Sequence, residues 1–335
     1  MGLNIREIVP KKELDFRNLK DEIIVVDAFN ALYQFLSSIR QYDGTPLKDK
    51  SGKVTSHLSG LLYRNISLLS EGIKIVYVFD GEAPDLKKKT GEKRSEIKRV
   101  AKEKFISAKE DDDVEGMKKY SSQMVKLDDE IIEESKEFLK ALGIGVIQAP
   151  SEGEAQASII SKEGRAYAVA SQDYDCLLFG APKLIQNLTL ARTRKTVSGV
   201  VEIKPEVIEL ENVLKELGIT HEQLIYLGIL VGTDYNIGGI KGIGQKKALK
   251  LVKEFKTPEK IFGSFEEELG FDWKEIFEMF YRPNVKKNAE ILFPKMNEDK
   301  IREILLKHDF SEERVEKQIE KLKMIKGKSA QKTLF

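Results

Sequence analysis

Acidic side chains follow each of four short apolar segments that are typical of buried strands. They are Asp27 after EIIVV, Asp80 after KIVYVF, Glu152 and Glu154 after GIGVIQAP, and Asp173 and Asp175 after AYAVA. In an open parallel sheet the ligand lies outside the carboxyl ends of the strands. The sequence therefore predicts that these six carboxylates meet at one edge of a sheet. Asp234, in VGTDYN just before a glycine-rich segment, is a seventh candidate.

Carboxylates brought together in this way repel one another unless cations or protons neutralise them. Oxygen ligands suit Mg²⁺ or Mn²⁺, and the lack of a His and Cys set argues against zinc. Two such ions, about 3.5–4 Å apart, would activate a water and stabilise the charge on both oxygens of a phosphodiester displacement. The pattern favours hydrolysis of a phosphodiester with two Mg²⁺ ions, for which Mn²⁺ can substitute.

Each carboxylate also has a purely structural explanation. Ser151 and Glu154 have capping-box spacing, Asp80 and Gly81 could form a simple turn, and Asp173 could cap the following segment. These explanations are favoured for any one residue, but coincidence is a poor account of all six at one edge.

Two basic residues follow Asp80 closely enough to add positive charge near a bound phosphate. Lys87 and Arg94 are seven positions apart, so they share one face if this segment is helical. Positive side chains beside the scissile phosphate stabilise the transition state. The neighbouring lysines at 88, 89 and 93 are expected to be solvated.

The elements that must position these groups follow from the apolar periodicity. Strands are expected at 22–26, 74–79, 143–150 and 166–170, separated by amphipathic helices such as 55–71, 128–142 and 152–163. This alternation predicts an α/β fold with a mostly parallel central sheet flanked by helices. No linker rich in Pro, Gly or Ser divides the chain, which favours a single domain over residues 1–326. A polar insertion at about 86–130 has too few apolar residues to be buried, so it should project from the body.

Composition excludes several classes of protein. The chain has 335 residues, 41% hydrophobic and 33% charged, and no segment reaches the roughly 20 apolar residues of a membrane span. The first residues contain no apolar signal-peptide core. Cys176 is the single cysteine, which excludes an internal disulfide and any multi-cysteine zinc site. A soluble intracellular protein is expected.

The net charge of +1 conceals clusters of one sign. Residues 86–110 contain ten basic and four acidic side chains, residues 111–134 three and nine, and residues 314–332 seven and two. Such clustering favours a polyanionic partner that is met at particular patches, although solvated helix faces are an equally good explanation for any one patch.

A second phosphate-binding element is indicated by KGIGQKKA at 241–248, within a unit at about 228–260. Gly242 and Gly244 allow tight turns in a helix-hairpin-helix, whose exposed N–H groups can bind a phosphate oxygen. Lys246 and Lys247 supply positive charge. Because this contact involves the backbone of the duplex, it predicts DNA binding without sequence preference.

The chain resembles an archaeal-type flap endonuclease of the structure-specific 5′-nuclease superfamily. The matching strings are VVDAFNALYQFL, TSHLSGLLYRN, YVFDGEAPDLK, APSEGEAQA, SQDYDCLLFG, VGTDYN, KGIGQKKA and FSEERV, which span nearly the whole chain. The resemblance implies a 5′-flap endonuclease, with possible 5′-3′ exonuclease activity, in Okazaki-fragment maturation and DNA repair. It also implies that the seven carboxylates form a two-metal site, and that the protein is a cytoplasmic monomer when free. Whether a monovalent cation sits at the hairpin is left open.

The resemblance also implies roles for residues that spacing alone does not assign. Positions matching Lys87 and Arg94 contact the scissile phosphate, and the insertion matches a helical arch that passes the 5′ single strand. Tyr33 matches a residue that stacks on a base, although ALYQFL by itself predicts a core position for it. Gly2, Arg40 and Arg64 match family positions that lie near or contact the DNA. Phe310 and Arg314 belong to a segment that resembles the one that binds a one-nucleotide 3′ flap.

The last residues, 327–335, are predicted to form a flexible tail. Family members end in a peptide that binds the sliding clamp (PCNA), and Gln331 and Leu334 have its spacing. The chain stops at Phe335, so the usual aromatic pair is incomplete. Clamp binding through Gln331, Leu334 and Phe335 is therefore expected with less support than nuclease activity.

Three alternatives remain open at this point. Another repair endonuclease or 5′-exonuclease of the superfamily would share the site, but the compact insertion disfavours the repair branch. A non-catalytic DNA-binding or clamp-associated scaffold would not need seven carboxylates. A PIN-like ribonuclease would explain the sheet edge but not KGIGQKKA.

Overall fold

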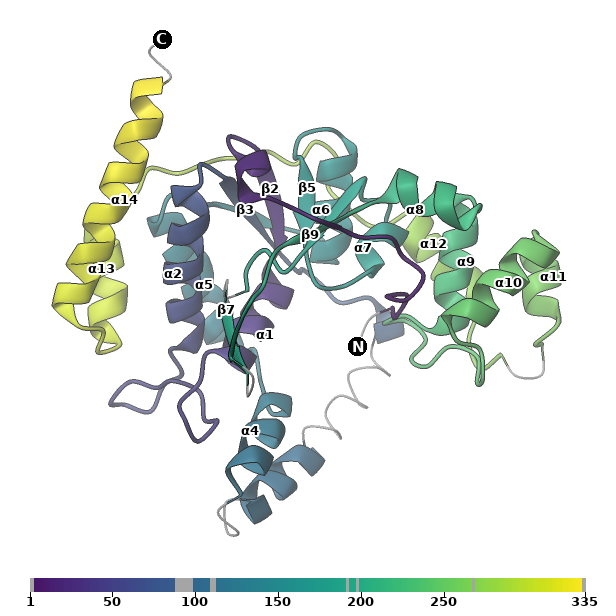
Figure 1. Ribbon diagram of the computed structural model, residues 1–335, viewed down its shortest axis with the longest axis horizontal. Helices are drawn as coiled ribbons and strands as arrows, with labels where there is room; N and C mark the ends of the chain where they lie inside the picture. The colour runs from purple at the N-terminus through teal and green to yellow at the C-terminus, as the bar shows by residue number, and fades with distance from the viewer. Residues whose placement is uncertain are drawn as a thin grey trace.

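The computed structural model describes residues 3–87, 99–108, 113–190, 193–196, 199–266 and 269–332, and a seven-stranded sheet runs through its centre (Figure 1). In spatial order the strands are β1 (Lys12–Glu13), β9 (Glu206–Glu209), β6 (Lys183–Gln186), β5 (Ala168–Ala170), β2 (Ile23–Asp27), β3 (Lys74–Phe79) and β4 (Gly145–Gln148). From β6 to β4 all neighbours are parallel, whereas β9 is antiparallel to β6 and β1 is antiparallel to β9. The predicted α/β class with a mostly parallel sheet is confirmed.

The four strands expected from the sequence are present because their apolar residues are buried on both faces of the sheet. In β2, Ile24 and Val26 belong to one hydrophobic core, while Val25 belongs to the other. Strands β6 and β9 were not predicted. A separate antiparallel ribbon, β7 (Thr193–Thr196) and β8 (Gly199–Glu202), was also missed.

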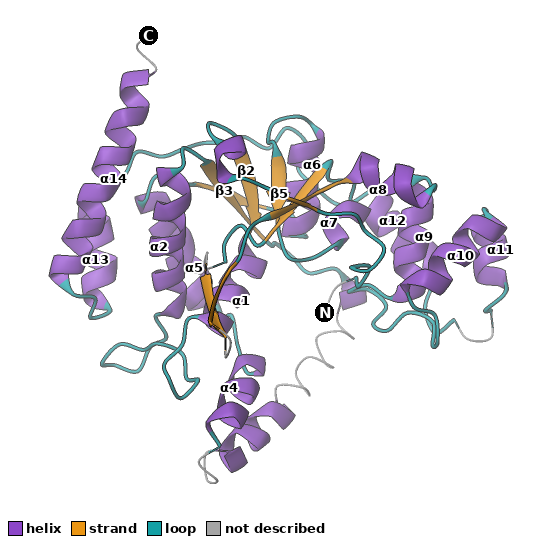
Figure 2. Ribbon diagram, in the orientation of Figure 1, coloured by secondary structure: helices purple, strands orange, loops and turns teal. Residues whose placement is uncertain are grey.

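Helices cover both faces of the sheet and form two cores (Figure 2). One face is covered by α1 (Ala28–Ser38), α2 (Ser56–Ser70) and α5 (Asp129–Ala141), and α13 (Glu298–Lys307) and α14 (Glu312–Lys332) pack outside α5 and α2. The other is covered by α6 (Gly153–Lys162), α7 (Asp175–Leu178) and α8 (Leu210–Leu217). Beside them, α9 (His221–Val231) packs on α7, α10 (Gln245–Phe255) and α12 (Trp273–Tyr281) pack on α9, and α11 (Pro258–Gly263) packs on α10. Two short 3₁₀ helices, η1 (Phe16–Leu19) and η2 (Asp85–Lys87), lie in the connections.

The polar insertion contributes α4 (Val114–Gln123) and a helix at 99–108, which lie away from the sheet in Figure 1. The Ser121 hydroxyl, near the end of α4, donates a hydrogen bond of 2.6 Å to the carbonyl of Gly44. This contact joins α4 to the loop that follows α1. Residues 88–98 and 109–112 of the insertion lie outside the described residues.

The C-terminal helix is longer than the sequence indicated. Helix α14 continues to Lys332, so residues 327–332 are helical where a flexible tail was expected. Within the part of the chain that the structure describes, no helix has the length and apolar character needed to span a membrane.

A chain of buried polar side chains ties the loop at 47–55 to α2, α5 and the end of α13. His308 places Nδ1 2.7 Å from Asp49 Oδ2 and Nε2 2.7 Å from Glu134 Oε1, and His57 Nε2 lies 3.2 Å from Glu134 Oε2. Burial raises the pKa of Glu134, but the hydrogen bonds from His57 and His308 outweigh it and hold the pKa at about 2. Hydrogen bonds from Ser51 and His308 likewise hold the pKa of Asp49 well below its ordinary value.

These lowered pKa values predict a loss of stability in acid. A carboxyl whose folded pKa is depressed stabilises the protein above its unfolded pKa, and that contribution is lost as pH falls through the folded pKa. For Glu134 the window runs from its ordinary pKa of 4.5 down to about 2. The free energy of unfolding, measured with urea at several pH values, should therefore fall less steeply in Glu134→Gln than in the unmodified protein. Glu137→Gln, on the exposed side of the same helix, is the control, and equal slopes in all three proteins would contradict the prediction.

Candidate active site

The predicted carboxylates reach one edge of the sheet because they follow parallel strands. Asp27 is the last residue of β2 and Asp80 follows β3 directly. Asp173 lies between β5 and α7, and Asp175 begins α7. Asp234 comes from the turn after α9, which packs against α7 on the same face of the sheet.

Helix α6 brings in the two glutamates at its first turn. Glu152 is the N-cap of α6, and neither Ser151 nor Glu154 forms the capping box that their spacing suggested, since Ser151 Oγ donates to the Glu82 carbonyl at 3.0 Å. The Gly153 N–H instead donates to Asp80 Oδ1 at 2.7 Å. A Cβ at Gly153 would lie 2.6 Å from that oxygen, so a bare glycine is needed for this approach.

Hydrogen bonds also hold Asp27, Glu154 and Asp175. Ser171 Oγ lies 3.2 Å from Asp27 Oδ2 and 3.4 Å from Glu154 Oε1, and it bridges the two side chains. Asp27 Oδ1 also accepts the N–H of Asn30 at 3.1 Å, which caps α1. At the other side, Asp175 Oδ1 accepts the N–H of Leu3 at 3.4 Å.

Burial and mutual repulsion raise the pKa values of these groups. Burial, followed by the charge of Asp27, raises the pKa of Asp80 to about 7. Burial, followed by the charges of Asp234 and Asp27, raises the pKa of Asp173 to about 6. For Asp27, Glu154 and Asp175 burial again raises the pKa, and nearby carboxylates add to the rise for the last two. The carboxylates thus behave as one electrostatic unit that is short of positive charge.

Lys87 is the cation that this unit holds. Its Nζ lies 2.7 Å from Glu152 Oε1, 2.8 Å from Glu152 Oε2 and 3.6 Å from Asp234 Oδ2. Burial lowers the pKa of Lys87, but the charges of Glu152 and Asp234 outweigh it and the net pKa is raised. The charge of the same ammonium offsets part of the rise in the pKa values of Asp27, Asp80, Glu154 and Asp175. It therefore lies close enough to act on most of the cluster.

The Lys87 ammonium offsets only part of the negative charge of the seven carboxylates, which leaves the cluster suited to further cations. Among the described residues, no three His, Cys, Asp or Glu side chains are arranged as a group that could hold a metal ion. Glu152 and Asp234 are instead paired with the Lys87 ammonium. The donor set consists of carboxylate oxygens, which fits a hard divalent cation such as Mg²⁺.

Tyr33, Arg40 and Arg64, for which the resemblance implies DNA contacts, lie on α1, just after it and on α2. Tyr33 is 38% exposed on α1, so the core position predicted from ALYQFL is wrong. Arg40 donates from Nε to the Ser37 carbonyl at 2.9 Å and from Nη1 to the Gly44 carbonyl at 2.7 Å. Arg64, on α2, is half-buried, and burial lowers the pKa values of both arginines. Among the described residues, neither arginine forms an ion pair or hydrogen bond with the carboxylates.

Helices α9 and α10 and the glycine-rich turn between them form the hairpin unit. Gly242 has φ of +79°, which favours glycine, whereas Gly244 is extended at the N-cap of α10. A Cβ at Gly244 would meet nothing within 4 Å, so the N-terminus of α10 is open. Lys247 is exposed, and the exposed Lys246 lies 3.0 Å from Glu7.

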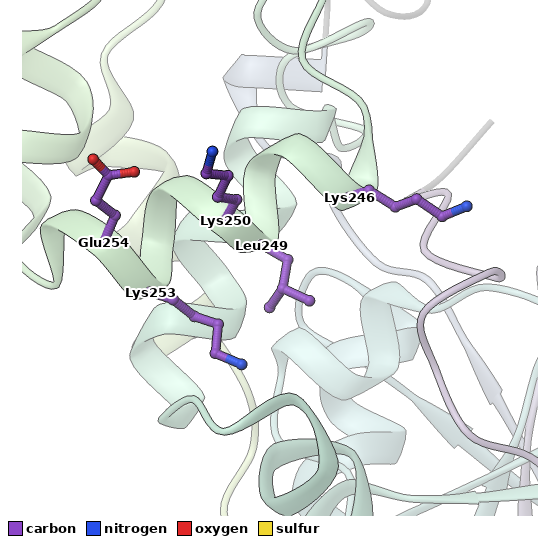
Figure 3. A pocket seen from close by; sticks show the side chains of 5 residues that line it. All are labelled: Lys246, Leu249, Lys250, Lys253 and Glu254. Atoms are coloured by element: carbon purple, nitrogen blue, oxygen red, sulfur yellow. The ribbon is translucent and has the colours of Figure 1, made fainter.

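The basic surface of α10 extends beyond the two lysines that the sequence singled out. A surface groove is lined by Lys246, Leu249, Lys250, Lys253 and Glu254 (Figure 3). Lysines spaced along one helix in this way can follow a phosphate backbone.

Of the C-terminal residues proposed to bind a 3′ flap or the clamp, those that the structure describes lie on or beside α14, away from the carboxylate cluster. Phe310 is half-buried against the core under α13 and α14, and Arg314 is exposed on α14. Gln331 lies in the last turn of α14. Gly2, Arg94, Leu334 and Phe335 lie outside the described residues.

Sequence reasoning missed two residues of the site. Ser171 bridges Asp27 and Glu154, and Tyr235 lies beneath Lys87, with its ring centroid 5.7 Å from Nζ. Ser171 lies within SQDYD and Tyr235 within VGTDYN, the segments that carry predicted carboxylates. That proximity in sequence is the signal that could have identified them.

Comparison with known proteins agrees with this architecture. Residues 3–101 match the XPG N-terminal domain and residues 143–234 match the XPG I-region, the two segments that carry the carboxylates. The chain thus has the paired regions of XPG-type nucleases.

Relatives narrow the assignment further. The chain is 50% identical over 337 residues to flap endonuclease 1 of Pyrococcus furiosus, covering 100% of this chain and 98% of that protein. It is similar to the structure of flap endonuclease-1 from Methanococcus jannaschii, with 38% identity, a TM-score of 0.77, and coverage of 98% of this chain and 100% of that one. The chain belongs to the flap endonuclease 1 family.

A more distant structure shares the fold. It is the Holliday junction-resolving enzyme GEN1 in complex with product DNA and a Mg²⁺ ion, with 15% identity and a TM-score of 0.60. That match covers 95% of this chain and 76% of the GEN1 chain.

Proposed function

We propose that this structure-specific nuclease cleaves 5′-flap DNA at the junction of single and double strands, with two Mg²⁺ ions held by the carboxylate cluster. Membership of the family makes the chain a metal-dependent endonuclease. The observation that carries the finer proposal is the set of buried and half-buried carboxylates gathered at one sheet edge beside the ammonium of Lys87. The Mg²⁺ in the GEN1 complex supports the choice of ion.

The residues that would hold the ions are Asp27, Asp80, Glu152, Glu154, Asp173, Asp175 and Asp234. When bound, the ions would lower the pKa of a water and neutralise charge on the phosphodiester oxygens. The backbone N–H of Gly153 and the hydroxyl of Ser171 hold Asp80, Asp27 and Glu154 by hydrogen bonds. Lys87 would leave Glu152 for the scissile phosphate, where its charge stabilises the transition state.

Elements around the carboxylate cluster would bind the rest of the substrate. Residues 1–326 act as one nuclease domain, with the insertion at 86–130 admitting the 5′ single strand. Tyr33 stacks on a base of the reacting strand and Arg94 contacts its scissile phosphate, and Gly2, Arg40 and Arg64 contact the DNA. Phe310 and Arg314 receive a short 3′ flap.

The test of the function is a duplex that carries a labelled 5′ flap, incubated with Mg²⁺ and then with a chelator. Cleavage at the junction, lost on chelation and restored by Mg²⁺ or Mn²⁺, is expected. Cleavage of single-stranded RNA instead of the flap would favour the ribonuclease alternative. Binding without cleavage in Mg²⁺ would favour a non-catalytic scaffold.

Replacing Lys246 and Lys247 together by Ala should weaken DNA binding equally for unrelated sequences. Each lysine that neutralises a phosphate contributes about 1 to the slope of log affinity against log salt. The double variant should therefore lower that slope by about 2, as measured by titration of a labelled duplex at several salt concentrations. Replacement of Lys12 and Lys183, basic residues of the sheet far from α10 in sequence, serves as the control. An unchanged slope would show that α10 does not face the DNA.

Deletion of residues 331–335 should abolish stimulation by the sliding clamp while cleavage of a free flap stays unchanged. Gln331, Leu334 and Phe335 are the anchors proposed for this partner. Affinity from so few anchors is expected to be modest, because ordering a short segment costs free energy. Calorimetry with the clamp measures the contact directly. Equal affinity before and after the deletion would place the contact elsewhere.

A further inference from the structure

The ring of Tyr235 forms a second contact for the Lys87 ammonium. Lys87 Nζ lies 5.7 Å from the ring centroid, in addition to its ion pairs with Glu152 and Asp234. A cation within about 6 Å of an aromatic face is attracted by the ring quadrupole, and more strongly where water is excluded. Tyr235 is buried, so its ring offers Lys87 a contact that carries no negative charge.

The position of this ring is set by groups other than Lys87. The Tyr235 N–H donates to Thr233 Oγ1 at 3.2 Å, and Thr233 Oγ1 donates to Asn236 Oδ1 at 2.8 Å. Asn236 Nδ2 in turn donates to the Ile229 carbonyl of α9 at 2.7 Å. On the other side, the Phe280 ring of α12 meets the Tyr235 ring edge to face at 5.2 Å. The ring therefore stays in place when Lys87 moves.

The hydroxyl of Tyr235 has no evident part in this packing. It is buried beside Glu152 and, among the residues that the structure describes, makes no hydrogen bond of good geometry. Both carboxylate oxygens of Glu152 already lie within 2.8 Å of Lys87 Nζ. The ring face is the part of Tyr235 that meets the Lys87 ammonium, while the hydroxyl lies beside Glu152.

We propose that Tyr235 is a positioning residue for Lys87, whose ring face retains the ammonium at the scissile phosphate when metal ions take Glu152 and Asp234. The inference rests on the proposed function. Metal ions at those carboxylates would repel the ammonium and remove both ion pairs that hold it in this structure. Without the ring, the flexible lysine side chain would spread over many rotamers, and the phosphate would meet it less often.

The kinetic test is single-turnover cleavage of a labelled 5′ flap in Mg²⁺ by Tyr235→Leu and Tyr235→Phe, each with Lys87 intact and in Lys87→Ala. Tyr235→Leu should slow cleavage about tenfold when Lys87 is present, the size expected for a desolvated cation–π contact. It should have no further effect in Lys87→Ala. Tyr235→Phe should leave the rate of each background unchanged, and DNA affinity should not change. An equal loss with and without Lys87 would overturn the proposal.

A series of ring analogues keeps the test valid if Tyr235→Leu folds poorly. Phenylalanine with one, two or three ring fluorines at position 235 preserves shape and progressively weakens the negative face of the ring. The cleavage rate should fall stepwise along the series. A flat series would overturn the proposal.

A measurement without cleavage separates this inference from the function. In the DNA-free protein, the NMR signal of the Lys87 ε-methylene protons should carry an upfield ring-current shift that persists when Ca²⁺ is added. Tyr235→Leu should remove that shift. Loss of the shift on adding Ca²⁺ would overturn the inference. Failure of the unmodified protein to cleave any flap would overturn the function alone.

Discussion

An Asp173→Asn protein is expected to bind 5′-flap DNA with near-normal affinity and to cleave it at least about 10²-fold more slowly, by comparison with the loss of one group that stabilises a developing charge. The substitution preserves shape but removes a buried charge that interacts with Asp234 and Asp27. Because Asp173 is one of the residues proposed to hold the ions, its loss should weaken metal binding as well as the chemical step.

Single-turnover cleavage at saturating enzyme measures the chemical step, and calorimetry with Mn²⁺ measures the metal affinity. Asp80→Asn should behave in the same way, because Asp80 belongs to the same coupled set. Asp299→Asn, whose side chain is 98% exposed on α13, makes the same chemical change away from the site and should cleave normally. Near-normal single-turnover cleavage by Asp173→Asn and Asp80→Asn would refute the two-metal proposal.

Lys87→Ala is expected to lower the single-turnover rate by about 10²-fold, by analogy with the loss of one oxyanion donor. DNA affinity should change little, since many other cations contact the phosphate backbone. The same variant should bind Mn²⁺ more tightly in the absence of DNA, because Lys87 pairs with Glu152 and Asp234 in this structure and competes with the metal.

The two effects of Lys87→Ala have opposite signs, which separates a catalytic role from a structural one. Lys12→Ala, which removes an exposed ion pair with Glu209, is the control and should change neither quantity. A variant that altered only the dissociation constant for DNA would show that Lys87 acts in binding and not in the chemical step.

Much of the sheet could be predicted because parallel strands buried on both faces appear as unbroken apolar runs. KIVYVF is an example, and β3 begins and ends where the sequence indicated. Strands β6 and β9 lack that signal: KLIQ is short and ends in polar residues, while EVIE carries a glutamate at each end. Their pairing depends on partners distant along the chain, which a local pattern cannot reveal.

The grouping of the carboxylates at one sheet edge could also be predicted from the sequence. Strand ends identify which carboxylates share an edge, because the direction of the strands follows from the alternation of strands and helices. The exposure of Tyr33 was missed because ALYQFL is mostly apolar. The helical spacing does indicate it, since the buried residues of α1 share one face and Tyr33 lies beside Gln34, off that face. Contacts such as that between Lys87 and the Tyr235 ring join residues far apart in sequence, so only the folded chain reveals them.

The edge strand β1 has a consequence for how the chain acquires its structure during synthesis. Its only strand partner in the described sheet is β9, and Leu14, just beyond it, donates its N–H to the Pro205 carbonyl at 2.8 Å. Domains begin to fold while the ribosome is still adding residues. Asp27 and Asp80 emerge early, but β1 must wait for residues near 206, and the last carboxylate arrives at Asp234. If the proposed site needs all seven carboxylates, a nascent chain cannot cut nucleic acid until residue 234 has been translated.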